Sequence, residues 1–172
     1  GNVTTYLYAW EDFQWQIAPP ESPVSFDLVK EIRYPGVPDA NAPRYTYFLT
    51  AGPKVNRLAS ATDIAGFTTS YQYNNFGNLT SVLYPDDGVQ EYTYDSMGRM
   101  SSSTAPVHPQ GATLYGYVDG NGTGLVTSVT PPGNTAAQQF QYYRTGQVRI
   151  ATSPEGGETE YVLDGRYRTV TV

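Results

Sequence analysis

The sequence predicts an all-β protein built from consecutive antiparallel β-hairpins, each about 21 residues long. Three observations lead to this prediction. A pair of aromatic residues two positions apart recurs along the chain, a glycine-containing turn follows each pair, and a second turn signal ends each unit. Because each period contains two turns, it also contains two strands. Helical periodicity is absent from most of the chain.

The aromatic pair marks the first strand of each hairpin. Residues two apart on a strand lie on the same face of the sheet, and tyrosine, threonine and valine dominate the flanking positions, as is typical of strands. Plain alternation of side chains is also expected in the second strands, at 125–129, 148–150 and 167–172. The pairs are Tyr6/Tyr8, Tyr45/Tyr47, Tyr71/Tyr73, Tyr92/Tyr94, Tyr115/Tyr117 and Phe140/Tyr142, with a weaker copy at Tyr161/Leu163.

The turn after each aromatic pair carries a glycine in register, at Gly77, Gly98 and Gly146 when the units are aligned without gaps. A hairpin loop of three to five residues commonly requires one residue at positive φ, which glycine adopts without steric penalty. Two units have insertions at this turn, before Asn56 and before Leu125, where added residues are tolerated best. The second turn signals lie at 63–66, 85–88, 131–134 and 154–157.

The repeat is less regular at the start of the chain. Residues 1–44 are predicted to form a degenerate N-terminal repeat region with a proline-rich loop from Pro19 to Pro23, although residues 29–36 read like a second strand and its turn. Residues 45–172 are predicted to form the hairpin array. Strand-like sequence at 3–8 and 168–172 predicts sheet edges that can pair with further strands.

One unit combines all the features of the repeat. Tyr92-Thr-Tyr-Asp-Ser-Met-Gly-Arg99, preceded by Tyr84-Pro-Asp-Asp-Gly88, resembles the YD repeat of Rhs proteins, teneurins and the shell components of insecticidal toxin complexes. The resemblance covers roughly residues 45 to 172 and implies a curved or spiralling sheet of the shell or solenoid type. Other units replace Asp95 by asparagine or tyrosine and Arg99 by asparagine or glutamine.

The aligned units and the resemblance together assign a structural role to a set of repeat residues. Many Rhs shells also cleave themselves near an Asp-Pro-x-Gly motif, but this chain has no Asp-Pro dipeptide, so that activity is not expected here. The predicted structural residues are Tyr71, Tyr73, Gly77, Tyr92, Tyr94, Asp95, Gly98, Arg99, Tyr115, Tyr117, Phe140, Tyr142 and Gly146.

Composition excludes several classes of function. Lys+Arg 10 against Asp+Glu 16 give a net charge of -6, which argues against a nucleic-acid partner because no basic surface can neutralise phosphates. The absence of cysteine excludes disulfides and thiolate metal sites, and the single histidine, His108, cannot build a zinc site or a Ser-His-Asp triad. No apolar run is long enough for a membrane span. We expect no cofactor and no metal.

Some residues are open to a chemical interpretation. Asp86 and Asp87, with Glu91 nearby, could serve as paired carboxylates of a glycosidase, but they are more simply turn formers beside Pro85. The segment 119–124 looks like a calcium loop, or equally an inserted hairpin turn.

Aromatic residues could also bind ligands. The tyrosine ladder could bind sugars, although regular cross-strand aromatic pairs are expected to stabilise the sheet itself. Trp10 and Trp15, outside the regular repeat, are better candidates for a contact surface toward a ligand or a neighbouring chain.

The sequence therefore predicts a non-catalytic structural protein that builds an extracellular or cell-surface assembly. It would act as a self-associating subunit of a filament or tube, or as a segment of a larger Rhs-type shell. The expected partners are copies of itself or other repeats, joined through edge strands. An adhesion module that binds glycans or proteins is the alternative, and a glycosidase is a less favoured one.

Overall fold

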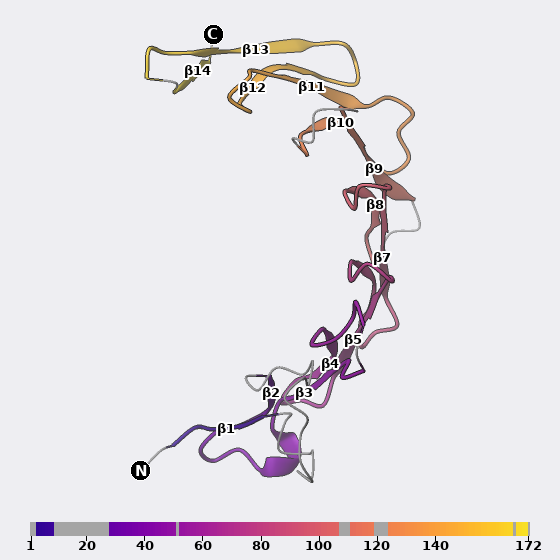
Figure 1. The fold of residues 1–172 in the computed structure, drawn as a ribbon, viewed down its shortest axis with the longest axis vertical. Helices are drawn as coiled ribbons and strands as arrows, with labels where there is room; N and C mark the ends of the chain where they lie inside the picture. Colours follow the sequence, from indigo (N-terminus) through magenta and orange to yellow (C-terminus); the bar gives the residue numbers. More distant parts are fainter. Residues whose placement is uncertain are drawn as a thin grey trace. The chain divides into compact units, whose positions relative to one another are not determined.

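The computed structural model describes residues 3–8, 28–50, 52–106, 111–118, 124–166 and 168–171. Within these residues the fold is all-β, with fourteen strands and one short 3-10 helix (Figure 1). The strand order in the sheet follows the sequence order from β1 to β14, and each strand is antiparallel to the next. The predicted all-β fold of consecutive antiparallel hairpins is thus confirmed, while the curvature of the sheet stays a prediction.

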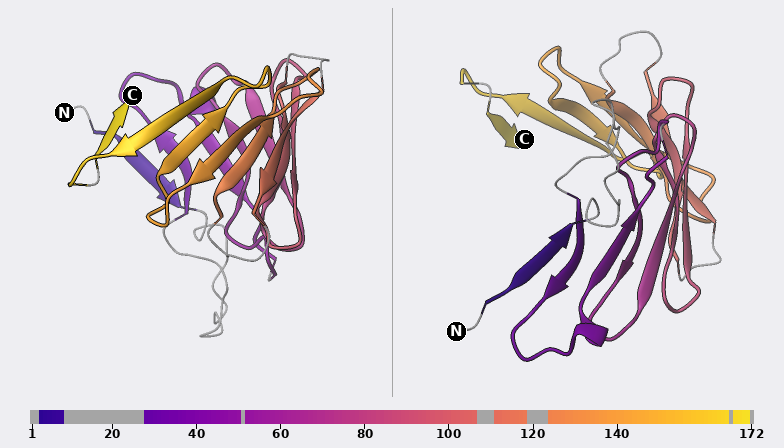
Figure 2. Two further views of the ribbon diagram at one scale, coloured as in Figure 1. Left: turned by 90° about the horizontal axis from the view of Figure 1, so that it is seen from above. Right: turned by 60° about the horizontal axis from the view of Figure 1, so that its bottom comes forward.

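The chain divides into two units, residues 1–91 and 92–172, and within each unit neighbouring strands lie side by side (Figure 2). Strand β7 passes from one unit to the other, since its first half pairs with β6 and its second half with β8. The first unit holds β1 (Thr5–Tyr8), β2 (Val29–Arg33), η2 (Asp39–Asn41), β3 (Arg44–Tyr47), β4 (Leu58–Thr62), β5 (Thr68–Tyr73), β6 (Leu79–Leu83) and the start of β7 (Val89–Tyr94). The second holds the rest of β7, β8 (Met100–Thr104), β9 (Ala112–Tyr117), β10 (Val126–Thr130), β11 (Gln138–Tyr142), β12 (Val148–Thr152), β13 (Glu158–Leu163) and β14 (Thr169–Thr171).

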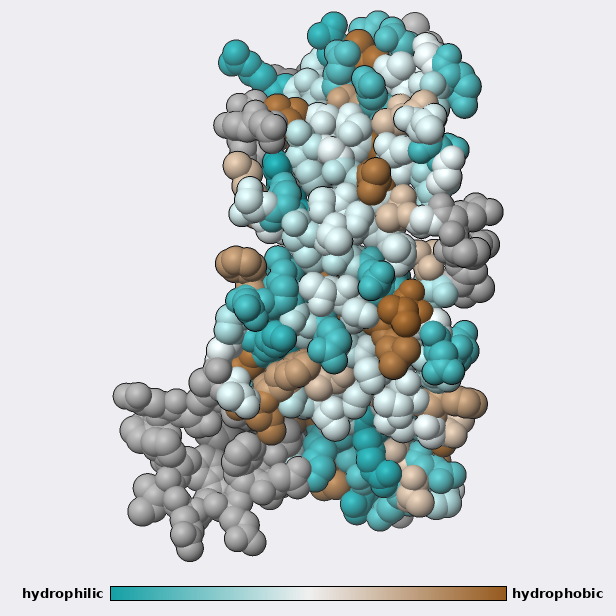
Figure 3. All heavy atoms as spheres, turned by 90° about the vertical axis from the view of Figure 1, so that its right-hand side faces the viewer, coloured by the Kyte–Doolittle hydropathy of each residue, from teal (hydrophilic) through white to brown (hydrophobic). Residues whose placement is uncertain are grey.

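The sheet has two chemically different faces. Along β5, for example, Tyr71 and Tyr73 are partly buried while Gln72 between them is exposed. Among the described residues only two apolar side chains are buried, those of Ala42 and Val82. On the face shown in Figure 3, hydrophobic residues form separate spots among polar and intermediate ones. Within the part of the chain that the structure describes, each unit therefore lacks the second layer that covers the core of most domains.

The six hairpins that begin with a full aromatic pair contain a β-bulge at the same place, whereas β13, which carries the weaker copy Tyr161/Leu163, pairs with β14 without a register shift. In the β5–β6 hairpin, Tyr71 lies opposite Val82 and Tyr73 lies opposite Leu79, so two residue steps on the first strand face three steps on the second. The extra residue on the second strand locally increases the twist and reverses the direction of the side chains that follow. The extra residues are Lys30, Ala59, Thr80, Ser101, Thr127 and Arg149.

The bulge corrects one expectation from the sequence. Plain alternation along 125–129 and 148–150 is wrong, because the register shift lies inside both segments. Val126 and Val129, three positions apart, both lie opposite the aromatic pair of β9. Residues directly opposite each other share a face of the sheet, so the bulge places apolar side chains at both ends of the second strand beside the tyrosines.

Candidate functional site

The turn after the aromatic pair is the most highly organised site of the repeat. In the β7–β8 hairpin, the Asp95 N–H donates to the Arg99 carbonyl at 2.9 Å and the Gly98 N–H donates to the Asp95 carbonyl at 3.0 Å. One carboxylate oxygen of Asp95 accepts the N–H groups of Met97 and Arg99, both at 2.9 Å. The other accepts Nε of Arg99 at 2.7 Å. Gly98 has φ 78°, which completes a three-residue loop with a left-handed residue at its end.

These hydrogen bonds determine the ionisation of Asp95. Its partial burial raises the pKa, but hydrogen bonds from the backbone and side chain of Arg99 and from Met97 outweigh burial, and the net pKa is lowered. A carboxylate held in this way stays ionised and positions the turn. It is therefore unsuited to act as a general acid.

The last hairpin of the described chain repeats this arrangement, which the sequence reasoning missed. One carboxylate oxygen of Asp164 accepts the N–H groups of Arg166 and Arg168, at 2.8 and 2.9 Å, and the other accepts Nε of Arg168 at 2.7 Å. The pKa of Asp164 is lowered by the backbone hydrogen bonds from Arg168 and Arg166 and by the Arg168 side chain. The signal in the sequence is an Asp and an Arg four positions apart directly after a strand.

The same loop geometry survives other substitutions and an insertion. Asn74 accepts the N–H groups of Phe76 and Asn78 through its side-chain oxygen, as Asp95 does with its own neighbours. In the β3–β4 hairpin, Phe48 and Arg57 make the closing backbone bond at 2.9 Å, although they are nine positions apart instead of four. Asn56, with φ 62°, there takes the left-handed position that Gly98 occupies in its hairpin.

The two members of each aromatic pair have different roles. In three pairs the second member donates its hydroxyl to the backbone carbonyl of the first residue of the preceding strand, and so ties its hairpin to the one before. Burial raises the pKa of Tyr47, Tyr73, Tyr94, Tyr117 and Tyr142, the second members. The bonds with stated lengths join Tyr47 to Val29 at 2.7 Å, Tyr117 to Met100 at 2.7 Å and Tyr142 to Val126 at 2.5 Å.

The first members of the pairs lie opposite the residue three positions after the start of the second strand. Tyr71 lies opposite the buried Val82, Tyr92 opposite Ser103, and Tyr115 opposite Val129. Phe140 lies opposite Ala151. The side chain that faces the first member therefore differs in size from one hairpin to the next.

Arginine and glycine add contacts between consecutive hairpins. The Arg99 guanidinium lies 4.5 Å from the centre of the Tyr117 ring, and that of Arg57 lies 5.8 Å from the Tyr73 ring, both within the range of cation–π attraction. Gly77, with φ 80°, lies against the preceding loop: a Cβ atom there would be 2.6 Å from the Pro53 carbonyl oxygen. Gly146 has a similar φ of 86° but open space around it.

A second charged cluster lies in the N-terminal unit and was not expected from the sequence. The Glu31 carboxylate is only 6% exposed and accepts Nε of Arg33 at 2.5 Å and Nε of Arg44 at 3.2 Å. Arg44 lies directly opposite Glu31 on β3 and also donates to the Asp39 carbonyl at 2.8 Å. The hydrogen bond from Arg33 outweighs burial and lowers the pKa of Glu31. Opposite charges facing each other on β2 and β3 are the signal that could have revealed this anchor.

The acidic residues of the second turn type act on the backbone. Tyr84 and Gly88 close a three-residue loop in which Asp87 takes the left-handed position, with φ 64°, and Asp86 accepts the Gly88 N–H at 3.2 Å. Asp tolerates this conformation better than most residues. Turn formation therefore accounts for the positions of both Asp86 and Asp87 without a catalytic role.

Several residues singled out from the sequence lie outside the described residues. Trp10, Trp15, His108 and the segment 119–123 belong to this group. Among the residues that the structure does describe, no cluster of three His, Asp or Glu side chains could hold a metal ion. In the same residues, no helix has the length and apolarity needed to cross a membrane.

The RHS Repeat family matches residues 54–89 and 77–113, and no curated protein matches the sequence. Among solved structures, the chain is similar to TcdB2-TccC3 without its hypervariable C-terminal region, with 14% identity over 86% of the chain and a TM-score of 0.45. The corresponding values are 11%, 99% and 0.34 for TcdB2-TccC3-Cdc42, and 11%, 83% and 0.33 for TcdB2-TccC3. The chain spans only 10%, 12% and 11% of the length of these three structures.

The matched region coincides with the geometry described above. Residues 54–113 include the Asp95–Arg99 turn and the bulged β5–β6 and β7–β8 hairpins. Both the sequence pattern and the hairpins that it forms are thus those of one repeat class. Residues 54–113 of this chain match the RHS Repeat family.

Proposed function

We propose that this chain is a non-catalytic wall element: a run of RHS hairpins that forms part of a larger extracellular or cell-surface assembly. The observation that carries the proposal is the single-layer sheet, in which only two apolar side chains of the described residues are buried. A free-standing domain of this size normally buries a sizeable core. A wall, in contrast, is stabilised mainly from hairpin to hairpin, as in other repeat proteins.

The sheet edges supply the means of assembly. Within the described residues, β1 and β14 each have a single pairing partner, so each presents an unpaired row of backbone N–H and carbonyl groups. Such an edge is a template for another strand. The partners are either copies of this chain, giving a filament or tube, or neighbouring RHS hairpins of a longer shell.

The acidic side chains support the non-catalytic part of the proposal. Asp95 and Asp164 are bound to arginine and backbone N–H groups and have lowered pKa values, and Asp86 and Asp87 shape a turn. A glycosidase requires one carboxyl group with a raised pKa as its acid. We expect no hydrolysis of neutral oligosaccharides, and equal inactivity of Asp86→Asn and Asp87→Asn. Turnover that is lost in either variant would contradict a purely structural role.

The experiment that tests assembly measures mass and shape on one sample, by light scattering and electron microscopy across a range of concentrations. A variant with Thr5→Lys and Thr169→Lys charges both edge strands. A matched control with Gln72→Lys and Gln141→Lys adds the same charge at exposed positions of interior strands. Filaments or tubes that the edge variant loses and the control retains would establish pairing between copies.

The shell-segment form predicts a different result for the isolated chain. It stays an 18.9 kDa monomer, and the amides of β1 and β14 exchange with deuterium faster than those of interior strands. A monomer whose edge strands are as protected as β5 or β9 would contradict both forms of the proposal. Assembly that is equally strong in the edge variant would contradict edge pairing.

A further inference from the structure

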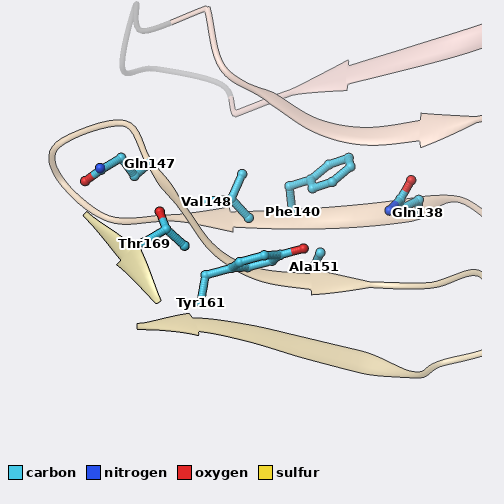
Figure 4. A pocket seen from close by; sticks show the side chains of 7 residues that line it. All are labelled: Gln138, Phe140, Gln147, Val148, Ala151, Tyr161 and Thr169. Carbon is cyan, nitrogen blue, oxygen red and sulfur yellow. The ribbon is translucent and has the colours of Figure 1, made fainter. Parts of the chain in front are cut away.

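A hollow lies on the aromatic face of the second unit, over strands β11 to β14 (Figure 4). It has a volume of about 410 Å³, within the usual range for small-ligand sites. Figure 4 shows the Tyr161 ring lying along it with the hydroxyl beside Ala151, and the side chains of Gln138 and Gln147 at opposite ends. Its lining residues are Gln138, Phe140, Gln147, Val148, Ala151, Tyr161 and Thr169.

The hollow follows from one small residue in the repeat. Ala151 lies opposite Phe140, in the position where the β5–β6 hairpin has Val82 opposite Tyr71. Val82 fills its place and is only 5% exposed. The same substitution recurs in the first unit, where Ala61 lies opposite Tyr45 and lines a hollow of about 600 Å³. Alanine at this repeat position thus opens a space that valine fills.

The lining combines apolar surface with neutral polar groups. Phe140, Val148, Ala151 and the Tyr161 ring supply the apolar part, and none of the described lining residues carries a charge. The structure records no hydrogen bond from the side chains of Gln138 or Thr169, or from the Tyr161 hydroxyl, to the other described residues. These groups keep their full capacity to bind a ligand.

We propose that this hollow binds one pyranose ring of a neutral glycan. The apolar C–H face of the sugar packs against Phe140 and Tyr161, while its hydroxyl groups pair with the Gln138 amide and the Thr169 hydroxyl. An aliphatic side chain of a protein partner fits the apolar part equally well, but it removes water from these polar groups without replacing their hydrogen bonds. A charged ligand finds no opposite charge among the lining residues that the structure describes. The proposal adds a ligand to the chain and does not depend on assembly through the edges.

The test is a titration of the isotope-labelled full chain, followed by NMR, with four neutral tetrasaccharides: cellotetraose, maltotetraose, mannotetraose and chitotetraose. At least one is expected to bind with a Kd on the order of 1 mM and to shift the amides around residues 138–151 and 161. Ala151→Val should weaken binding about tenfold or more, since the two methyl groups of valine occupy the site. That variant should fold, because Val82 already occupies the equivalent position.

Matched controls separate a sugar site from a mere apolar depression. Ala61→Val makes the same change in the other unit and should leave this binding unaltered, while Gln138→Ala should weaken sugar binding without filling the hollow. Butan-1-ol serves as the aliphatic probe. The proposal is wrong if no tetrasaccharide binds at about 20 mM, if Ala151→Val binds as well as the wild type, or if butan-1-ol shifts the same amides more strongly and is insensitive to Gln138→Ala.

Discussion

Gly77 offers a sharp test of how consecutive hairpins contact one another. Substituting alanine has two physical effects. The residue keeps a φ of 80°, which costs a residue with a Cβ atom about 1–2 kcal/mol. The new Cβ atom would also lie 2.6 Å from the Pro53 carbonyl oxygen, and relieving such overpacking costs a further ~1–3 kcal/mol. Gly77→Ala is therefore expected to destabilise the N-terminal unit by about 2–5 kcal/mol.

Gly66→Ala is the matched control in the same unit. Gly66 has φ 86° and nothing within 4 Å of an added Cβ atom, so only the backbone penalty of about 1–2 kcal/mol applies. Urea unfolding followed by far-UV circular dichroism gives the free energy of unfolding of each variant. Hydrogen exchange on β4, β5 and β6 localises the loss to this unit. Equal destabilisation by the two substitutions would refute the close approach of Gly77 to Pro53.

Three further outcomes follow from the turn and tyrosine geometry. Tyr117→Phe keeps the ring under Arg99 but removes the 2.7 Å bond to a backbone carbonyl, so it should lower the free energy of unfolding by about 0.5–1.5 kcal/mol. The Tyr71 hydroxyl makes no such bond to a described residue, so Tyr71→Phe should change the free energy of unfolding by less than about 0.5 kcal/mol in the same urea titration. Because the pKa of Asp95 is lowered in the folded state, its contribution to stability is present above the pKa of the unfolded state, near pH 4, and is lost as the pH falls through the lower pKa of the folded state. Asp95→Asn should therefore weaken the acid dependence of unfolding. An unchanged dependence of stability on pH would contradict the pairing with Arg99. Asp87→Asn should leave the stability nearly unchanged because asparagine tolerates positive φ, whereas Asp87→Val should destabilise the protein by about 1–2 kcal/mol. Equal stability of the two variants in thermal unfolding would contradict the turn assignment.

The fold could be predicted because each hairpin is defined by residues that lie close together in the sequence. An aromatic pair with period-two spacing, followed by a turn glycine, defines a hairpin without reference to distant residues. Pairing between consecutive hairpins then follows from the short connections, as at Asp63–Phe67 and Ser153–Gly157. No long-range pairing had to be guessed, and this is why the strand order matches the order along the chain.

The bulge was missed because the second strands were compared with simple alternation. The signal was nevertheless present: apolar residues three positions apart, such as Leu79 and Val82 or Val126 and Val129, face aromatic residues two positions apart. These spacings can share one face only if the second strand holds an extra residue. A pattern of two against three is therefore the feature to search for in related sequences.

Compensation between distant residues was beyond sequence reasoning. Leu163 occupies the place of a second aromatic member and has no hydroxyl to donate to the preceding hairpin. Tyr143, in the position of Asp95, donates its own hydroxyl to the Tyr161 carbonyl at 2.9 Å and so links the same two hairpins from the other side. In the sequence, Leu163 and Tyr143 are two separate departures from the repeat. In the structure, the Tyr143 bond provides the link between hairpins that Leu163 cannot make.

The insertion between Phe48 and Arg57 has a practical meaning. The loop is five residues longer than its counterparts, yet its closing backbone bonds and its left-handed residue are those of the short loops. The closing geometry of the hairpin is therefore unaffected by the extra residues in its loop. Foreign peptides grafted at the equivalent turns 75–77 or 144–146 should leave the strand register intact, which would make this sheet a display scaffold that presents one guest segment per repeat.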